Sequence, residues 1–204
     1  MSEPPSPALM ALLGPQGALG WSHLLVSEAL ARRADVQALA ATRAPDVVQV
    51  VCTTLDGTSP RPPHLWRPDH LPPLDASGAL EGLLSTLLSA PGTRLCISLH
   101  QALAQLLSEG WPMAGACAEL TERVQALPAH CLGLLELGGY QHWPSGEGLR
   151  HAPADHRVPA ALWTVLESLA ATGHSPAIRL AWERDLPGLA VMLDEVRQAR
   201  ALLN

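Results

Sequence analysis

The chain has no lysine and no phenylalanine, and it has one tyrosine and one asparagine, the terminal Asn204. All thirteen basic residues are therefore arginine. These absences indicate coding in GC-rich DNA rather than a functional signature. Because phenylalanine is missing, we expect leucine and alanine to supply most of the core packing.

Clusters of positive charge and long hydrophobic runs are also missing. The formal net charge is -6 and the arginines form no basic patch, so we expect no nucleic-acid partner. No apolar run reaches the length that spans a membrane. Residues 1–8 lack the basic and apolar regions of a signal peptide. These features predict a cytoplasmic protein with no membrane partner.

The cysteines do not show the spacing of a zinc site. Cys52, Cys96, Cys117 and Cys131 lack the C-x-x-C pattern in which such ligands usually come. Three of them stand inside apolar runs, where a buried and unreactive thiol is the usual outcome. We therefore expect them to be core residues.

Length and composition predict one soluble domain. The 204 residues, 48% of them apolar, can bury a sizeable core. We expect a single α/β domain over residues 1–204, with a partly disordered N-terminus over residues 1–20. Residues 56–75 hold six of the nineteen prolines and predict an irregular surface loop. Residues 22–43 have the apolar periodicity of a helix.

Short apolar runs alternate with helical patterns along the rest of the chain. Strands are predicted at residues 47–51, 94–99, 132–137 and 177–182. Helices are predicted from a cap at Asp75 to residue 87, over residues 101–108 and 117–127, from Pro159 to residue 169, and from Pro187 onward. The buried face of the last helix is predicted to hold Leu189, Leu193 and Val196.

This alternation predicts parallel βαβ units and a partial or reduced TIM-type (β/α) barrel with roughly four clear βα units. A closed barrel of this type needs eight strands. Either the N-terminal region contains further strands, or the barrel has open edges that a helix, the proline-rich loop or a partner subunit must cover.

The last third of the chain carries a recognisable order of motifs. Val158-Pro159 precedes a helical pattern with Trp163, and a predicted strand ends in Ala181-Trp182-Glu183 before Asp185-Leu186-Pro187. This order resembles the multinuclear non-haem iron-dependent oxidative enzymes (the MNIO family), which include the methanobactin-synthesis oxygenase. The resemblance is clearest from Gly133 to Leu203 and fainter over residues 22–132. It implies a TIM barrel that binds several irons and modifies ribosomally made peptides, commonly with a small partner protein. It also implies that about the first three strands of the family barrel are missing.

The positions that hold metal ligands in that family carry other residues here. Iron in such sites needs converging imidazole and carboxylate donors. Alanine takes ligand places at residues 152, 154 and 181, so the resemblance implies that iron is lost and that no cofactor is expected. The substituted segments are Glu136-Leu137-Gly138-Gly139-Tyr140 for His-Leu-Ala-Gly-His, Ala152 and Ala154 for Asp and His, Ala181 for Glu, Ser98-Leu99-His100-Gln101 for Asp-x-Asn-Asn, and Cys52-Thr53 near an earlier Glu-Asn.

A rebuilt metal site is the alternative. Its candidate ligands are the residues of ligand type at strand ends and in the loop before Val158, namely His100, Glu136, His142, Asp155, His156 and Glu183. Each also has a structural interpretation. Glu136 stands in an apolar strand, where it can pair with an arginine such as Arg179 on the next strand. His100 can be a hydrogen-bonded structural residue. Gly138-Gly139 indicates close backbone packing rather than a phosphate-binding loop.

Six tryptophans stand out in a chain poor in aromatics. Trp163 and Trp182 are expected in the core. Trp66, Trp111 and Trp143 fall at predicted loops or element ends, where tryptophan often contacts a partner. For Trp66 an equal alternative is that it pins the proline-rich loop onto its own domain.

Two functional interpretations remain open. In the first, the chain is a non-catalytic MNIO-like binding subunit in the modification of a ribosomally made peptide. Its partner would be a full-length MNIO homologue or the precursor peptide, and it could form an oligomer. In the second, the chain is an iron-dependent oxidative enzyme that acts on peptide cysteine through the rebuilt site.

Overall fold

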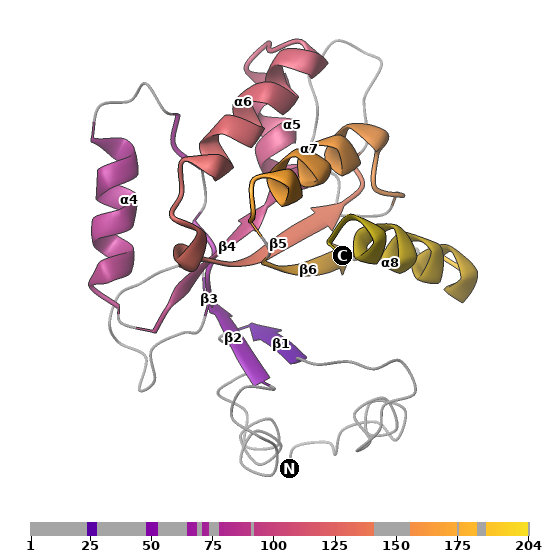
Figure 1. The fold of residues 1–204 in the computed structure, drawn as a ribbon, viewed down its shortest axis with the longest axis horizontal. Helices are drawn as coiled ribbons and strands as arrows, with labels where there is room; N and C mark the ends of the chain where they lie inside the picture. The colour runs from indigo at the N-terminus through magenta and orange to yellow at the C-terminus, as the bar shows by residue number, and fades with distance from the viewer. Residues whose placement is uncertain are drawn as a thin grey trace, which may run out of the picture.

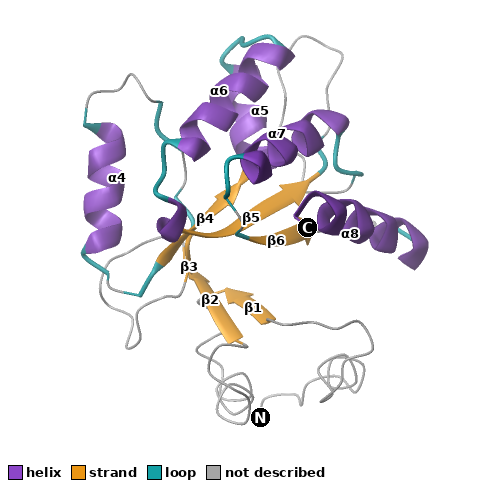
Figure 2. Cartoon of the chain, viewed as in Figure 1, coloured by secondary structure: helices purple, strands orange, loops and turns teal. Residues whose placement is uncertain are grey.

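The computed structural model describes residues 24–27, 48–52, 65–68, 71–73, 78–90, 92–140, 156–174, 176–182 and 187–203 (Figure 1). From β3 (Leu65–Trp66) to the C-terminus, strands and helices alternate along the described residues, as Figure 2 shows by colour. The strands are β1 (Leu24–Ser27), β2 (Val48–Cys52), β3 (Leu65–Trp66), β4 (Arg94–Ser98), β5 (Leu132–Gly138) and β6 (Ala177–Ala181). The helices are α4 (Ala79–Leu88), α5 (Leu99–Ser108), α6 (Met113–Gln125), the 3-10 turn η1 (Ala129–Cys131), α7 (Ala160–Ala171) and α8 (Leu189–Leu203).

The six strands form one parallel sheet whose spatial order is the order of the chain, β1-β2-β3-β4-β5-β6. A helix follows each of β3, β4, β5 and β6. The predicted α/β class with parallel strands is therefore confirmed. Within the described residues, β1 and β6 are the two edges of the sheet.

Two strands lie where the sequence predicted something else. Leu24–Ser27 pairs with β2, so the helix predicted over residues 22–43 is wrong at these four residues, and residues 28–43 lie outside the described part. Leu65–Trp66 pairs with β2 and β4 inside the segment predicted as an irregular loop. Both predictions failed because neighbouring strands supply hydrogen-bond partners for the backbone of these residues. This tertiary pairing outweighs the local sequence pattern on which the predictions were based. The residues before Val47 thus do contribute a strand.

The predicted helix positions agree better than the predicted helix ends. Helix α5 begins at Leu99 and α8 at Leu189, while α4 follows Gly78, which has a φ of 85° that favours glycine. The buried face predicted for α8 is confirmed only in part, since Leu193 and Val196 are half-buried. Leu189 is 56% exposed, whereas Glu195 and Ala199 are buried. No helix in the described part of the chain is both long and apolar enough to cross a membrane.

One face of the sheet packs against the helices. Side chains alternate across a strand, so Leu95 and Ile97 of β4 and Leu135 and Leu137 of β5 share this face. They belong to one buried cluster with leucines of α4, α5, α6 and α7. Figure 1 shows α5, α6 and α7 above β4, β5 and β6, on the side away from β1 and β2.

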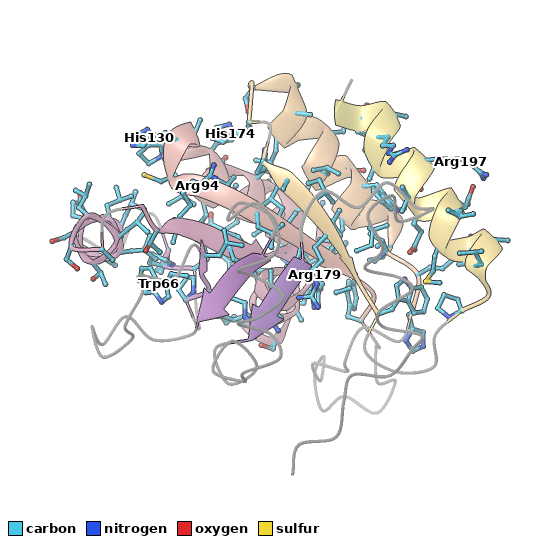
Figure 3. All side chains as sticks on the ribbon, turned by 90° about the horizontal axis from the view of Figure 1, so that it is seen from below. Trp66, Arg94, His130, His174, Arg179 and Arg197 are labelled. Carbon is cyan, nitrogen blue, oxygen red and sulfur yellow. The ribbon has the colours of Figure 1, made fainter. Side chains whose placement is uncertain are left out.

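The opposite face of β4 and β5 points toward the side on which β1 and β2 lie. In Figure 3, which is seen from below, β1 and β2 lie in front. A small buried cluster on this face contains Leu65, Cys96 and Leu134. Burial on both faces is typical of parallel strands and explains the continuous apolar runs in the sequence. The polar side chains of the candidate site stand on this second face.

Candidate functional site

The centre of the site is Glu136, a carboxylate in the interior of β5 that is 1% exposed. An unpaired charge at such depth would be strongly destabilising. Each of its oxygens contacts an arginine: Oε1 lies 2.5 Å from Nη1 of Arg179, and Oε2 lies 3.2 Å from Nη1 of Arg67. The pairing of Glu136 with Arg179 that the sequence predicted is confirmed, and Arg67 is an additional partner.

Sheet register brings these groups together. Ser98 of β4, Glu136 of β5 and Arg179 of β6 are cross-strand partners and form one row on the same face. Arg67 follows directly after β3, which pairs with β4 on its other side. Ser98 ends β4, and Glu136 stands two residues before the end of β5, so the row lies near the carboxyl ends of the strands. Ligand sites of parallel α/β proteins form at that end.

Cys96 lies one step deeper on the same face, opposite Leu134. It is 0% exposed. Burial, and next the Glu136 carboxylate, raise the pKa of Cys96 to about 12, while Arg67 and Arg179 partly oppose the shift. The thiol is therefore protonated at neutral pH, and only the thiolate is nucleophilic. The prediction of a buried cysteine is confirmed here and at Cys131, which is 7% exposed.

The raised pKa of Cys96 predicts a loss of stability at alkaline pH. The thiol of the unfolded chain ionises near its ordinary pKa of 9.0, while the folded thiol keeps its proton. The contribution of this group to stability is therefore complete below that pH and decreases as the pH rises. Between pH 9 and pH 10 this one group is expected to lower the free energy of unfolding by about 1 kcal/mol. Urea unfolding at both pH values measures the change.

Cys96→Ala is the matched control for this titration. The substitution lowers stability at every pH by removing buried volume, but it also removes the ionisation. The decrease between pH 9 and pH 10 is therefore expected to be about 1 kcal/mol smaller in the variant. An identical decrease in both proteins would show that Cys96 does not titrate in this way.

His100 is not at a strand end, as the sequence predicted, but in the first turn of α5, because β4 ends at Ser98. It is 2% exposed, and a hydrogen bond links its Nδ1 to Oγ of Ser98 at 3.1 Å. A small pocket of about 30 Å³, room for roughly one water molecule, opens beside this pair. Its lining residues are Pro68, Leu71, Cys96, Ile97, Ser98, Gln101, Ala102 and Gln105.

The remaining candidate metal ligands do not come together in the part of the chain that the structure describes. His156 is exposed, and His142, Asp155 and Glu183 lie outside the described residues, as do Ala152 and Ala154. Within the described residues no three histidine, cysteine, aspartate or glutamate side chains could share a metal ion. Ala181, which the sequence resemblance aligns with a ligand position, is buried at the end of β6.

The tryptophans predicted to contact a partner differ in their surroundings. Trp111 is 41% exposed beside Met113, which is 43% exposed. Trp66 is half-buried on β3 and packs against the main core, as the alternative interpretation of this residue expected. Trp143 lies outside the described residues. The expectation that Trp163 is a core residue is confirmed by its 8% exposure.

Three charged residues with internal partners were missed in the sequence: Arg67, which is half-buried, and Glu195 and Arg123, which are buried. No sequence pattern identifies Arg67 as a partner of Glu136, because its contact depends on the pairing of β3 with β4. Glu195 accepts hydrogen bonds from the backbone N–H of Val158 at 2.8 Å and from Nε1 of Trp182 at 2.9 Å. Arg123 donates to the carbonyl of Leu71 at 3.0 Å. The helical spacing of Met192, Glu195 and Ala199 was the available signal for Glu195.

Comparisons with protein-family models and with curated proteins find no match to this chain.

Proposed function

We propose that this chain is a non-catalytic, MNIO-like binding subunit that acts in the modification of a ribosomally made peptide. The observation that supports it best is the pairing of the Glu136 carboxylate with two arginines. This residue falls on a position that holds a metal-ligating histidine in the family it resembles. Here both of its oxygens contact arginine. Guanidinium groups thus supply the positive charge that a metal ion would bring.

The residues present do not fit an iron site in the described part of the sheet. Metal ligands must be deprotonated and available to the ion. The Glu136 oxygens are engaged by Arg67 and Arg179, the Cys96 thiol holds its proton, and Ala181 has no donor. A metal at Glu136 would have to displace two ion pairs. The iron-dependent alternative therefore requires the ligand candidates outside the described residues.

The architecture supports the same proposal. Sequential parallel strands with the helices on one face are the arrangement of a (β/α) barrel. We take the sheet to be a partial barrel of this type with β1 and β6 at its edges. An exposed strand edge can pair with an extended peptide, and this mode of binding needs no catalytic residue. The full-length homologue or the precursor peptide is the partner that this proposal names.

Affinity capture from the native host tests the proposal. A tagged full chain is expected to recover a full-length MNIO homologue or a short cysteine-bearing peptide, and purified protein is expected to contain far less than one iron per chain. Recovery of neither partner contradicts the proposal. Stoichiometric iron after anaerobic loading with ferrous ion would instead favour the oxidative enzyme.

A pair of surface variants sharpens the capture experiment. Trp111→Ala removes a side chain that is 41% exposed near the sheet's carboxyl end, where Met113 contacts the hydroxyl of Tyr140. Truncation of a central interface tryptophan commonly costs about 2 kcal/mol or more of binding energy, so recovery of the partner is expected to fall. Leu88→Ala on α4 removes a side chain that is 74% exposed and is expected to leave recovery unchanged. Equal recovery in both variants would exclude Trp111 from the interface.

A further inference from the structure

We propose that Arg67 and Arg179, oriented by Glu136, form a binding site for a single carboxylate group of a peptide. The two guanidinium groups converge on one buried carboxylate and are themselves partly open to solvent. The inference rests on the proposed function only in assigning the carboxylate to a peptide.

The cluster of Glu136, Arg67 and Arg179 carries more positive than negative charge. Two guanidinium groups and one carboxylate leave a net charge of about +1 in a protein whose overall formal charge is -6. The side chain of Glu136 is 2% exposed, whereas those of Arg67 and Arg179 are 32% and 43% exposed. The negative group is therefore inside and the positive groups face outward, so solvent or a ligand meets the positive side.

Within the described residues, the contacts of the two arginines use only part of their N–H donors. A guanidinium has five N–H donors in a rigid plane. Among the described residues, Arg67 and Arg179 each bind Glu136 through Nη1 alone. The remaining donors of each plane suit the paired oxygens of a carboxylate, which arginine binds in a bidentate geometry. Glu136 thus acts as a positioning residue that limits the freedom of both side chains before a ligand binds.

The two arginines lie outside the small pocket beside Ser98 and Pro68. That pocket has a volume of about 30 Å³ and its lining does not include Arg67 or Arg179, so an anionic group held by these arginines lies outside it. Arg179 lies well away from the other labelled basic residues, Arg94, His130, His174 and Arg197, in the view from below (Figure 3). Among the described basic residues that Figure 3 labels, Arg179 therefore belongs to no broad basic surface of the kind that nucleic acid requires.

Arginine-detected NMR of the full chain tests the site directly. Titration with acetate is expected to shift the Nε–Hε signals of Arg67 and Arg179 in a saturable way. Arg157 is the internal control, since it is also ion-paired, to Asp194 at 3.9 Å, but lies 61% exposed on the surface. Equal shifts at Arg157, or no saturable shift at Arg67 and Arg179, would overturn the inference.

Short peptides then identify the source of the carboxylate. Acetyl-Ala-Ala with a free C-terminus and acetyl-Asp-amide carry the same chemical group in different places, and acetyl-Ala-Ala-amide carries none. Binding of either acid without binding of the amide supports the inference and names the source. Binding of inorganic phosphate with no binding of either acid would overturn the assignment to a carboxylate.

Matched charge-neutralising variants complete the experiment. Arg179→Gln is expected to weaken peptide binding about tenfold, because a hydrogen bond to a charged group is lost. Arg157→Gln makes the same change in charge at a surface ion pair and is expected to leave affinity unchanged. If Arg179→Gln does not fold, the wild-type titration still decides the question. Failure of anion binding alongside recovery of a partner would remove this inference and leave the proposed function in place.

Discussion

Replacement of Gly139 by alanine is expected to lower the free energy of unfolding by about 3 kcal/mol. Gly139 follows β5, and the chain before α7 passes directly over it. An added Cβ would overlap the carbonyl oxygen of His156 and lie 2.5 Å from its carbonyl carbon. Backbone atoms cannot move aside cheaply, so the segment that leads to α7 would have to shift.

Gly82→Ala is the matched control for this substitution. Gly82 lies inside α4, and a Cβ at this position would meet no atom within 4 Å. Alanine is the better helix former, so this variant is expected to gain about 0.5–1 kcal/mol. Urea unfolding of both variants measures the difference. A Gly139→Ala protein as stable as the parent would show that the approach of His156 is not a fixed part of the fold.

Glu195→Ala is expected to lower the free energy of unfolding by about 3 kcal/mol, because it removes the acceptor of the buried N–H of Val158 and of the half-buried indole N–H of Trp182. Glu195 is 4% exposed, and its two oxygens accept from the N–H of Val158 and the indole N–H of Trp182. One side chain on α8 thereby joins Val158, two residues before α7, to Trp182, the residue after β6. Its loss is expected to lower the melting temperature by about 6–12 °C.

The neighbouring Asp194 provides the control for Glu195. Its side chain is 63% exposed, and its ion pair with Arg157 spans 3.9 Å. Exposed pairs of this kind contribute little, so Asp194→Ala is expected to change stability by no more than about 0.5 kcal/mol. Calorimetry of the two variants separates the effects. Similar melting temperatures would mean that the contacts of Glu195 do not stabilise the fold.

The strands with continuous apolar sequence were predictable, and those with ordinary sequence were not. Residues of β4 and β5 are buried on both faces, which leaves an unmistakable pattern of leucine, isoleucine and cysteine. β3 has two residues and depends on hydrogen bonds from β2 and β4. β1 has an apolar spacing that also suits a helix. In both cases the neighbouring strands decided the structure.

The candidate site shows the same division. Glu136 was recognisable because a carboxylate in an apolar strand needs a partner, and Arg179 stood in register on the next strand. Arg67 could not be found, since sixty-nine residues separate it from Glu136. The buried face of α8 was assigned by hydrophobicity alone, and Glu195 was missed because hydrogen bonds rather than apolar contact explain its burial.

Sequence alone therefore determined the alternation of parallel strands and helices, the burial of the cysteines at positions 96 and 131, and the pairing of one carboxylate with the next strand. Each of these follows from a local pattern, because burial limits which residues a strand or helix can contain. Only the tertiary structure decided that the six strands of the described residues pair in chain order and that a second arginine reaches Glu136. Those features depend on contacts between distant segments, and no single segment carries the information to specify them.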